Sequence, residues 1–454
     1  MSERSVAHEP VDVAAAVVER ARRAGATACD AVMIEIESSS TAVRLGEVET
    51  VKLSRERRLG LRCFVGQASA VASTADLSPD ALDAFASQVV EMARAVAPDP
   101  LAGLPDPSLF ARDFPELEIA DPAGLELSPE ERVERARRCE AAALGADPRL
   151  VNSEGAEFAL SSSHVAYVSS LGFSGSYRTT SYSLSVAPVA AENGSMQRDY
   201  WYDASRSLAR LADPESIGRK AAERALRRLG AKQVPTQQVP VVFDPQTAAT
   251  LLSHVASAAC GGALYRRASF LLDKVGQQIA SPLVTIVDDG RMLRGLASRP
   301  FDAEGVATRR NVVIEHGVLK SYLLDTYSAR KLGLATTGNA ARSVGDVPGA
   351  SPTNFYLEKG TCTPEEVIAS VERGLYVTGL SGFGVNGVTG DYSRGASGLW
   401  IENGKLTHPV EEVTVAGNLL QMLRDIEMVA DDLTFRSSIA SPTIKIRQMT
   451  VAGR

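Results

Sequence analysis

The side chains best suited to hold a ligand are concentrated in one glycine-rich stretch, Gly382 to Gly395. Glycine adopts backbone angles that other residues avoid, so a loop of this composition can bring its backbone close to a ligand. The polar residues between the glycines are candidate contacts with a substrate or a partner, and they are Asn386, Thr389, Asp391, Tyr392, Ser393 and Arg394. This stretch is therefore predicted to be a binding loop.

Two further candidate binding residues, Tyr265 and Arg266, precede this loop. A guanidinium group can bind a carboxylate through two parallel hydrogen bonds, so Arg266 could clamp an acidic group of a ligand. The favoured alternative is that Arg266 and Arg267 form ion pairs with the nearby Asp273. This stretch alone does not separate the two interpretations.

The histidine and cysteine positions do not predict a metal site. Zinc usually needs three or four histidine, cysteine or carboxylate ligands. No two of the five histidines are close in sequence, and the five cysteines are scattered without a CxxC pair. We expect no metal and no other cofactor in this chain, with convergence of ligands from distant segments as the alternative.

Nucleophilic catalysis is also poorly supported, because it needs a serine or cysteine beside a base that a third group orients. Ser393 lacks the G-x-S-x-G elbow, and Cys260 has the setting of a small buried side chain. The loop also lacks the lysine-containing pattern of phosphate-binding loops. The favoured interpretation is that Asp391, Ser393 and Arg394 bond to the loop backbone, a peptide or a partner. No catalytic residue is predicted.

Composition and charge exclude several classes of protein. With 48 basic and 55 acidic side chains, the 454-residue chain has a net charge of -7, which argues against a protein that mainly holds nucleic acid. No apolar run approaches the length of a membrane span, and the N-terminus has no signal-peptide pattern. Scattered cysteines, odd in number, are typical of a reducing compartment. We expect a cytoplasmic protein with no nucleic-acid or membrane partner.

The elements that position the loop predict an α+β protein of two domains. An N-terminal domain of helices and antiparallel sheet, residues 1–232, contains a proline-rich connector near 97–127. A β-rich C-terminal domain with hairpins, residues 239–454, carries the loop 382–395. In the N-terminal part we expect helices at 11–24, 78–95 and 128–144, strands at 29–37, 40–51 and 59–72, and two or three strands within 157–186.

In the C-terminal part, the strongest turn signal is Asn403-Gly404, which predicts a hairpin over 398–415. A second hairpin is expected to turn at His316-Gly317. The other expected elements are strands at 239–244, 283–288 and 443–451 and helices at 245–260 and 418–429.

Several C-terminal stretches resemble the TldD/PmbA family of metallopeptidases, and its PmbA (TldE) branch in particular. The most specific is the motif from Gly384 to Gly398, GVNGVTGDYSRGASG. The others are Gly261 to Tyr265, Ser269 to Lys274, Thr285 to Gly290, Pro409 to Glu412 and Ala416 to Asn418.

In the TldD branch, the resemblance implies a zinc-binding helix with the pattern His-Glu-x-x-x-His and a cysteine ligand near the C-terminus. The matching helix here is 250–260, with His254 as its only histidine. If His254 is the first histidine of the pattern, the glutamate position is Val255 and the second histidine position is Ala259. If His254 is the second histidine, the first histidine position is Ala249 and the glutamate position is Thr250. No cysteine follows Cys362. The chain lacks this zinc motif.

The resemblance implies a non-catalytic subunit that pairs with a TldD-like chain in a cytoplasmic heterodimer, with zinc in the partner. Such a heterodimer would degrade or trim unfolded peptides, as in antitoxin turnover and maturation of microcin-type precursors. A stand-alone peptide-binding or scaffold homodimer is the alternative. An independent hydrolase using Ser393 or Cys260 is a third hypothesis. The family name refers to DNA gyrase, but none of these residues supports a physical contact with gyrase.

Overall fold

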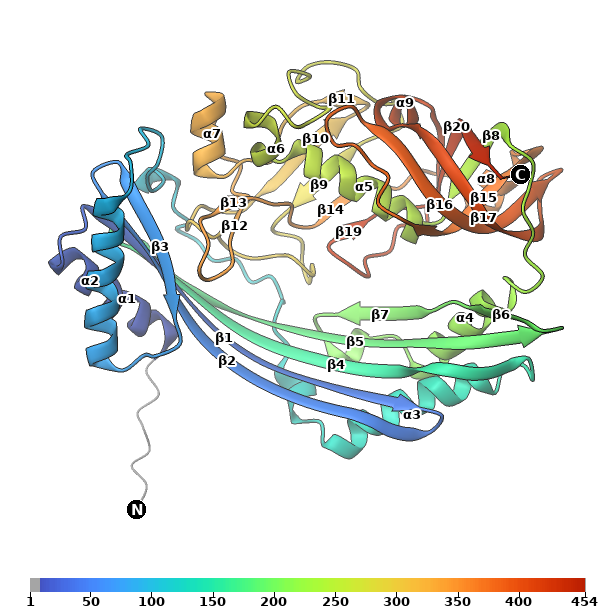
Figure 1. The fold of residues 1–454 in the computed structure, drawn as a ribbon, viewed down its shortest axis with the longest axis horizontal. Coiled ribbons are helices and arrows are strands. Elements are labelled where there is room, and N and C mark those ends of the chain that lie inside the picture. The colour runs from blue at the N-terminus through green and yellow to red at the C-terminus, as the bar shows by residue number, and fades with distance from the viewer. Residues whose placement is uncertain (1–8, 454) are drawn as a thin grey trace.

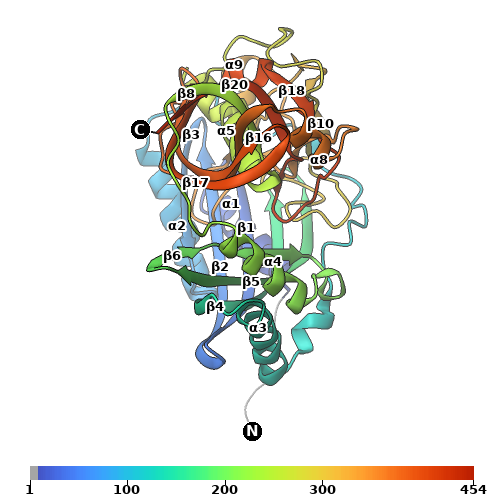
Figure 2. The same cartoon turned by 90° about the vertical axis from the view of Figure 1, so that its right-hand side faces the viewer.

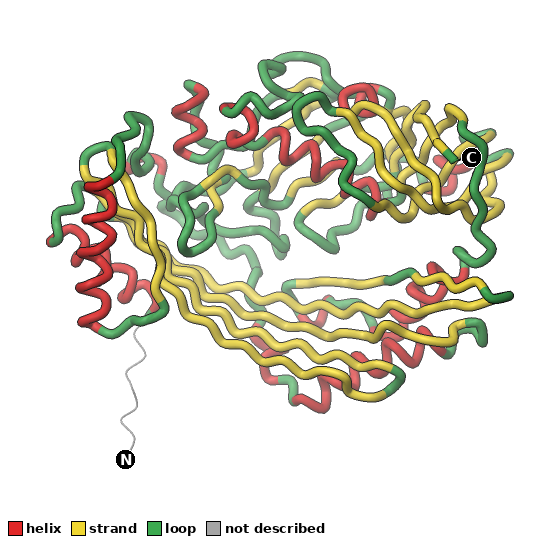
Figure 3. The backbone as a smooth tube through the Cα atoms, viewed as in Figure 1, coloured by secondary structure: helices red, strands yellow, loops and turns green. Residues whose placement is uncertain are grey.

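The structure, a computed structural model, describes residues 9–453 (Figure 1). Its first half is dominated by a seven-stranded antiparallel sheet in the order β3-β2-β1-β4-β5-β6, with β7 also paired to β5. The strands are β1 (Ala28–Arg44), β2 (Glu47–Val65), β3 (Ala68–Thr74), β4 (Leu150–Ser169), β5 (Ser174–Glu192), β6 (Ser195–Arg198) and β7 (Trp201–Ser205). Four of them are long and run side by side as one curved layer (Figure 3).

Helices cover two ends of this sheet. Near one end, α1 (Pro10–Arg23) and α2 (Pro79–Ala95) pack on β1 to β3 around a core that includes Val17, Leu61 and Val89. Near the other, α3 (Pro129–Leu144) and α4 (Pro214–Leu226) pack on β4 and β5. Each of these four helices starts with a proline at its first turn, which the missing N–H of proline favours.

The second half contains a barrel formed by the strand order β17-β16-β15-β8-β20, closed by pairing of β17 with β20 and extended by β18 (Figure 2). These strands are β8 (Gln237–Phe243), β15 (Arg373–Ser381), β16 (Asp391–Glu402), β17 (Lys405–Asn418), β18 (Ile426–Val429) and β20 (Ile444–Ala452). Helix α5 (Pro245–Ala259) follows β8, and α9 (Leu419–Arg424) follows β17.

A smaller sheet in the order β11-β10-β9-β14-β19 lies beside the barrel, and β12 pairs with β13. Their bounds are β9 (Ile286–Asp289), β10 (Arg310–Glu315), β11 (Val318–Leu319), β12 (Ala340–Ala341), β13 (Gly349–Ala350), β14 (Phe355–Leu357) and β19 (Ile439–Ala440). The remaining helices are α6 (Gly261–Tyr265), α7 (Thr326–Leu332) and α8 (Pro364–Ala369), with three short 3-10 turns at Pro107–Leu109, Pro122–Glu126 and Leu208–Arg210.

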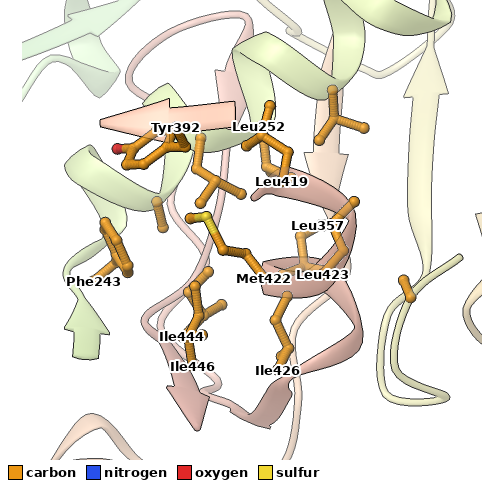
Figure 4. Packing of buried hydrophobic residues seen from close by; sticks show 14 of the residues in the cluster. Phe243, Leu252, Leu357, Tyr392, Leu419, Met422, Leu423, Ile426, Ile444 and Ile446 are labelled. Carbon is orange, nitrogen blue, oxygen red and sulfur yellow. The ribbon is translucent and has the colours of Figure 1, made fainter. Parts of the chain in front are cut away.

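One apolar core joins the barrel, α5 and α9. Figure 4 shows Leu419, Met422 and Leu423 of α9 packed among side chains from β8, β14, β18, β20 and α5. Tyr392, at the start of β16, belongs to the same core. The expected α+β class is confirmed.

Several of the expected boundaries are wrong. The strand expected over 59–72 is divided by a turn at Gly66-Gln67, and its two parts pair as β2 and β3. The strands expected at 29–37 and 40–51 are not separate, because β2 and β4 pair with Ser38 to Ser40 on both sides and make 28–44 the single strand β1. Residues 47–51 lie in β2, beyond the turn at Leu45-Gly46. The helix expected over 418–429 ends at Arg424, because Ile426 to Val429 pair with β20. Residues 391–395, expected in the loop, are the first residues of β16 and pair with β17.

Buried arginines connect the first half to the second. Arg342 donates to Asp30 of β1 at 2.9 Å. Arg206 donates to the Gly295 carbonyl at 3.3 Å, and Arg224 of α4 pairs with Asp244 at 3.4 Å and donates to the Thr378 carbonyl at 3.0 Å. Because charged groups are costly to bury without partners, these contacts hold the two halves together.

Candidate functional site

A cavity of about 470 Å³ lies between helix α5 and the glycine-rich loop. Its α5 wall is formed by Thr250, Ser253, His254, Ser257 and Ala258. The opposite wall is formed by Gly382, Phe383, Val385, Gly387 and Arg394, and Ala263, Ala268, Phe270 and Leu419 complete the lining. The loop singled out in the sequence and the helix that carries His254 therefore meet at one cavity.

The loop is held mainly by its own polar side chains. The side-chain oxygen Oδ1 of Asn386 accepts from the N–H groups of Val388 and Thr389, at 2.9 and 3.3 Å. The Thr389 hydroxyl donates to the Asp391 carboxylate at 2.6 Å, and Asn418 donates to the Thr389 carbonyl at 2.9 Å. The bonds from Thr389 and Asn418 lower the pKa of Asp391. Asn386, Thr389 and Asp391 thus shape the loop through hydrogen bonds within it.

The loop also needs glycine for space. A Cβ at Gly384 would lie 2.0 Å from the Ser393 carbonyl oxygen, because the two segments pair where the Ser393 N–H donates to the Gly384 carbonyl at 2.7 Å. The loop therefore folds back onto the start of β16 and carries Arg394 to the cavity.

His254 and Arg394 line the cavity, and the buried Tyr392 lies behind them against His254. The His254 and Tyr392 rings meet edge to face with centroids 6.2 Å apart. Burial, and then the charge of Arg394, lowers the pKa of His254, while burial raises the pKa of Tyr392 to about 12. His254 Nε2, the Tyr392 hydroxyl and Arg394 Nε are buried and have no hydrogen-bond partner among residues 9–453.

The candidates Tyr265 and Arg266 do not line the cavity. Arg266 packs its guanidinium 5.4 Å from the centroid of the Tyr265 ring, and Tyr265 meets Tyr327 edge to face. Neither Arg266 nor Arg267 forms the expected ion pair with Asp273 in the described part of the chain. That expectation is wrong, and the ring of Tyr265 is the contact that Arg266 makes instead.

Neither candidate nucleophile has a base beside it. Ser393 is exposed, and its hydroxyl has no hydrogen bond to any described residue. Cys260 is buried, and burial raises the pKa of its thiol to about 12. A thiol with this pKa carries almost no thiolate at neutral pH, so it is a poor nucleophile.

The residues of the cavity do not fit a zinc ion. No group of three or more histidine, cysteine or carboxylate side chains is arranged to hold a metal within residues 9–453. In the cavity, His254 faces the cationic Arg394, and none of the lining residues is acidic. A positive charge beside a lone histidine repels a divalent cation, so this chain offers no zinc site here.

Two features of the cavity were missed from the sequence. Thr250, Ser253 and Ser257 share one face of α5, and their spacing of three and four residues could have shown this. Phe383 is fully exposed at the rim of the cavity. A fully exposed aromatic side chain in a loop beside a cavity is a signal of contact with a partner or ligand.

A larger groove of about 970 Å³ begins where the cavity ends, since Thr250 lines both. Side chains of both halves line it, among them Arg198, Asp199, Gln246, Ser381, Ser397 and Glu411. The mixture of charges and hydroxyls could accommodate a polar, extended chain.

No helix among residues 9–453 is long and apolar enough to cross a bilayer.

Family models match three consecutive parts of the chain. The PmbA/TldA metallopeptidase domain 1 matches residues 29–93, the central domain matches 122–229, and the C-terminal domain matches 236–453. The metalloprotease PmbA of Escherichia coli O157:H7 is 40% identical over 415 residues, which cover 91% of this chain and 90% of the relative. A TldD homologue of Haemophilus influenzae is 31% identical over 298 residues, 60% of this chain and 61% of the relative.

Solved structures share the fold. A candidate modulator of DNA gyrase from Bacteroides thetaiotaomicron is 31% identical with a TM-score of 0.91, and the match covers 98% of each chain. TldE from Thermococcus kodakarensis has a TM-score of 0.87 at 23% identity, over 96% of this chain and 99% of that one, which shows a common fold. The chain therefore belongs to the PmbA/TldD metallopeptidase family and to its PmbA/TldE-like branch.

Proposed function

We propose that this chain is the non-catalytic subunit of a cytoplasmic heterodimer that degrades or trims unfolded peptides, with the zinc in a TldD-like partner. One observation carries the proposal: the helix that would bear His-Glu-x-x-x-His in the TldD branch offers His254 alone, opposite Arg394. Peptide hydrolysis by zinc needs an ion that activates water and a carboxylate that takes its proton. This cavity supplies neither.

The groove beside the cavity supports a role in holding peptide. Its lining residues extend from the edge strand β6 to the strands β15, β16 and β17, and they include both hydrogen-bond donors and acceptors. An extended peptide there would be held mainly through its backbone, so the subunit would accept many sequences.

An unpaired strand edge is the proposed contact with the partner. β3 pairs with β2 only from Leu59 to Val65, so the outer edge of residues 47–58 has no strand partner in the described chain. Val51 and Leu53 are exposed there, by 59% and 81%. Exposed edges with apolar side chains are sites where another chain can add a strand.

A peptidase assay tests the proposal. The purified chain, a TldD-like partner and their mixture are incubated with an unstructured peptide, with and without a zinc chelator. Cleavage by the mixture that the chelator abolishes, at a rate well above that of either chain alone, is the expected result. Chelator-sensitive cleavage by this chain alone would sink the proposal.

The same edge favours one alternative, a stand-alone homodimer that binds peptide without cutting it. The two alternatives differ in what occupies residues 47–58. Light scattering of the chain alone and mixed with the partner separates them: a homodimer that persists in the mixture supports the alternative, and a one-to-one complex supports the heterodimer. Leu53→Lys, which puts a charge on the edge, should weaken either assembly.

A further inference from the structure

We propose that the cavity between His254 and Arg394 binds the C-terminal carboxylate of a peptide whose last side chain is apolar. This inference rests on the proposed function, since it names the part of a peptide that this subunit holds. It is carried by the charge, the unpartnered polar atoms and the apolar walls of one cavity.

The cavity contains an uncompensated positive charge. No hydrogen bond or ion pair joins the Arg394 side chain to another residue of 9–453, whereas Arg206, Arg224 and Arg342 all have such partners. The lining contains no aspartate or glutamate. A half-buried guanidinium without a counter-ion is best matched by an anion, and a carboxylate fits its paired donors.

Two buried nitrogen atoms, each from a residue that lines this cavity, lack partners among residues 9–453. His254 Nε2 and Arg394 Nε are shielded from solvent and make no hydrogen bond. Buried polar atoms are rarely left unpaired in folded proteins, because each costs free energy. A ligand that accepts hydrogen bonds would satisfy both atoms.

The hydroxyl groups of α5 suit the rest of a peptide. Thr250, Ser253 and Ser257 donate their protons to helix carbonyls at 2.8, 2.6 and 2.9 Å. Their oxygens keep free lone pairs, which can accept from the N–H groups of a peptide backbone.

The other walls are apolar. Phe270, Val385 and Leu419 line the cavity together with alanine side chains, and Phe383 lies exposed at its rim. A volume of about 470 Å³ is within the ~300–1,000 Å³ of small-molecule sites, enough for one or two residues. A cation and an apolar wall in one cavity match a terminal residue, which carries a carboxylate and a side chain on the same Cα. Because Thr250 also lines the groove, the preceding residues of the peptide could lie there.

Calorimetry with short peptides tests this inference on the chain alone. The probes are Ac-Ala-Ala-Phe with a free carboxylate, the same peptide with a C-terminal amide, and Ac-Ala-Asp-Phe amide, whose only carboxylate is internal. We expect the free acid to bind at least tenfold more tightly than either amide, the size of a charge-assisted hydrogen bond. Equal binding of the first two peptides, or binding of neither, overturns the inference. Tight binding of the internal acid overturns the assignment to a chain end.

Matched arginine variants locate the binding. Arg394→Gln should remove the preference for the free acid and leave the weak binding of the amide unchanged. Arg291→Gln, an equal loss of charge at an exposed side chain outside the cavity, should keep the full preference. A preference that survives in Arg394→Gln would refute the site. If Arg394→Gln does not fold, the comparison of the free acid with the amides on the unaltered chain still decides.

His254 gives a second readout. An anion beside it offsets the effect of Arg394, so the pKa of His254 should rise when the free acid binds and stay the same with the amide. NMR titration of the five histidines, with His254→Gln to assign the signal, measures this change.

The two proposals can fail separately. Selective binding of the free acid without cleavage in the mixture would retain the subsite and reject the peptidase subunit. Chelator-sensitive cleavage by the mixture without selective binding would do the reverse.

Discussion

Removing the carboxylate of Asp30 should destabilise the chain far more than removing a matched carboxylate on the same strand. Asp30 is fully buried and accepts from Arg62 at 2.5 and 3.1 Å, from Arg342 at 2.9 Å and from the Tyr167 hydroxyl at 3.1 Å. Without it, Arg342 has no carboxylate partner among residues 9–453, and Arg62 keeps only Glu304 there, at 3.5 Å.

The same pair of strands supplies the control. Asp30 lies opposite Arg62 on β1 and β2, and Glu37 lies opposite Arg55 in the same ladder. The Glu37–Arg55 pair is 3.0 Å long, but its side chains are 57% and 74% exposed. Breaking a buried pair costs about 3–5 kcal/mol because it leaves a charge buried without a partner. An exposed pair contributes about 0–1 kcal/mol.

Equilibrium unfolding in urea measures the two costs. The chain has two tryptophans, Trp201 in β7 and Trp400 in β16, so fluorescence follows both halves. We expect Asp30→Ala to lower the free energy of unfolding by about 3–5 kcal/mol, and Glu37→Ala by less than about 1 kcal/mol. Equal costs for the two variants would refute the reasoning, because burial would then not decide the strength of these pairs.

Three further predictions concern the loop, the pH dependence of stability and the thiols. Gly384→Ala should lower the free energy of unfolding by about 1–3 kcal/mol and reduce the activity of the mixture with the partner, because its Cβ would meet the Ser393 carbonyl oxygen at 2.0 Å. The control is Gly387→Ala, whose Cβ would lie 3.8 Å from its nearest neighbouring atom and which should unfold like the unaltered chain. Equal thermal melts of the two variants would count against the close packing of the loop. Burial, and then the charge of Glu304, raises the pKa of Asp302 to about 7, above its value of about 4 in an unfolded chain. The stability that comes from protonation of Asp302 is therefore present at low pH and is lost as the pH rises through about 7. The stability of the unaltered chain relative to Asp302→Asn should therefore be greater at pH 5 than at pH 8 in urea titrations, and no change between these pH values would contradict the raised pKa. Cys29, Cys139 and Cys260 are buried with thiol pKa values of about 12, so iodoacetamide at pH 8 should label them only after unfolding. Labelled residues are identified by mass spectrometry. Labelling of Cys260 in the folded chain would contradict this prediction and would support Cys260 as a nucleophile.

Local signals in the sequence predicted the parts of the fold that depend on neighbouring residues. The Asn403-Gly404 turn does join two strands, and both residues have positive φ, at 50° and 72°. The strand break expected near Ser38 to Ser40 was wrong, because pairing with β2 and β4 outweighs the low strand preference of serine. Such pairing depends on segments far away in the chain.

The candidate site was only partly predictable for the same reason. The loop was recognisable from its glycines, and Arg394 was named as a binding residue. Its position opposite His254 of α5 depends on how the barrel closes, which no short stretch of sequence reveals. The contact of Arg342 with Asp30, which are 312 residues apart, was equally hidden.

The pairing of Arg224 with Asp244 has a consequence for dividing the gene. The two residues lie on opposite sides of the linker around residues 230–236, and both are buried. A chain cut in that linker would leave Arg224 with Asp199 as its remaining carboxylate partner, and it would leave Asp244 with its bonds from Thr247 but without an arginine. Each fragment would expose a charged surface that is complementary to the other. Separately produced fragments should therefore be poorly soluble alone and recover a folded protein when produced together, which makes this linker a site for fragment complementation and unsuitable for isolating either half.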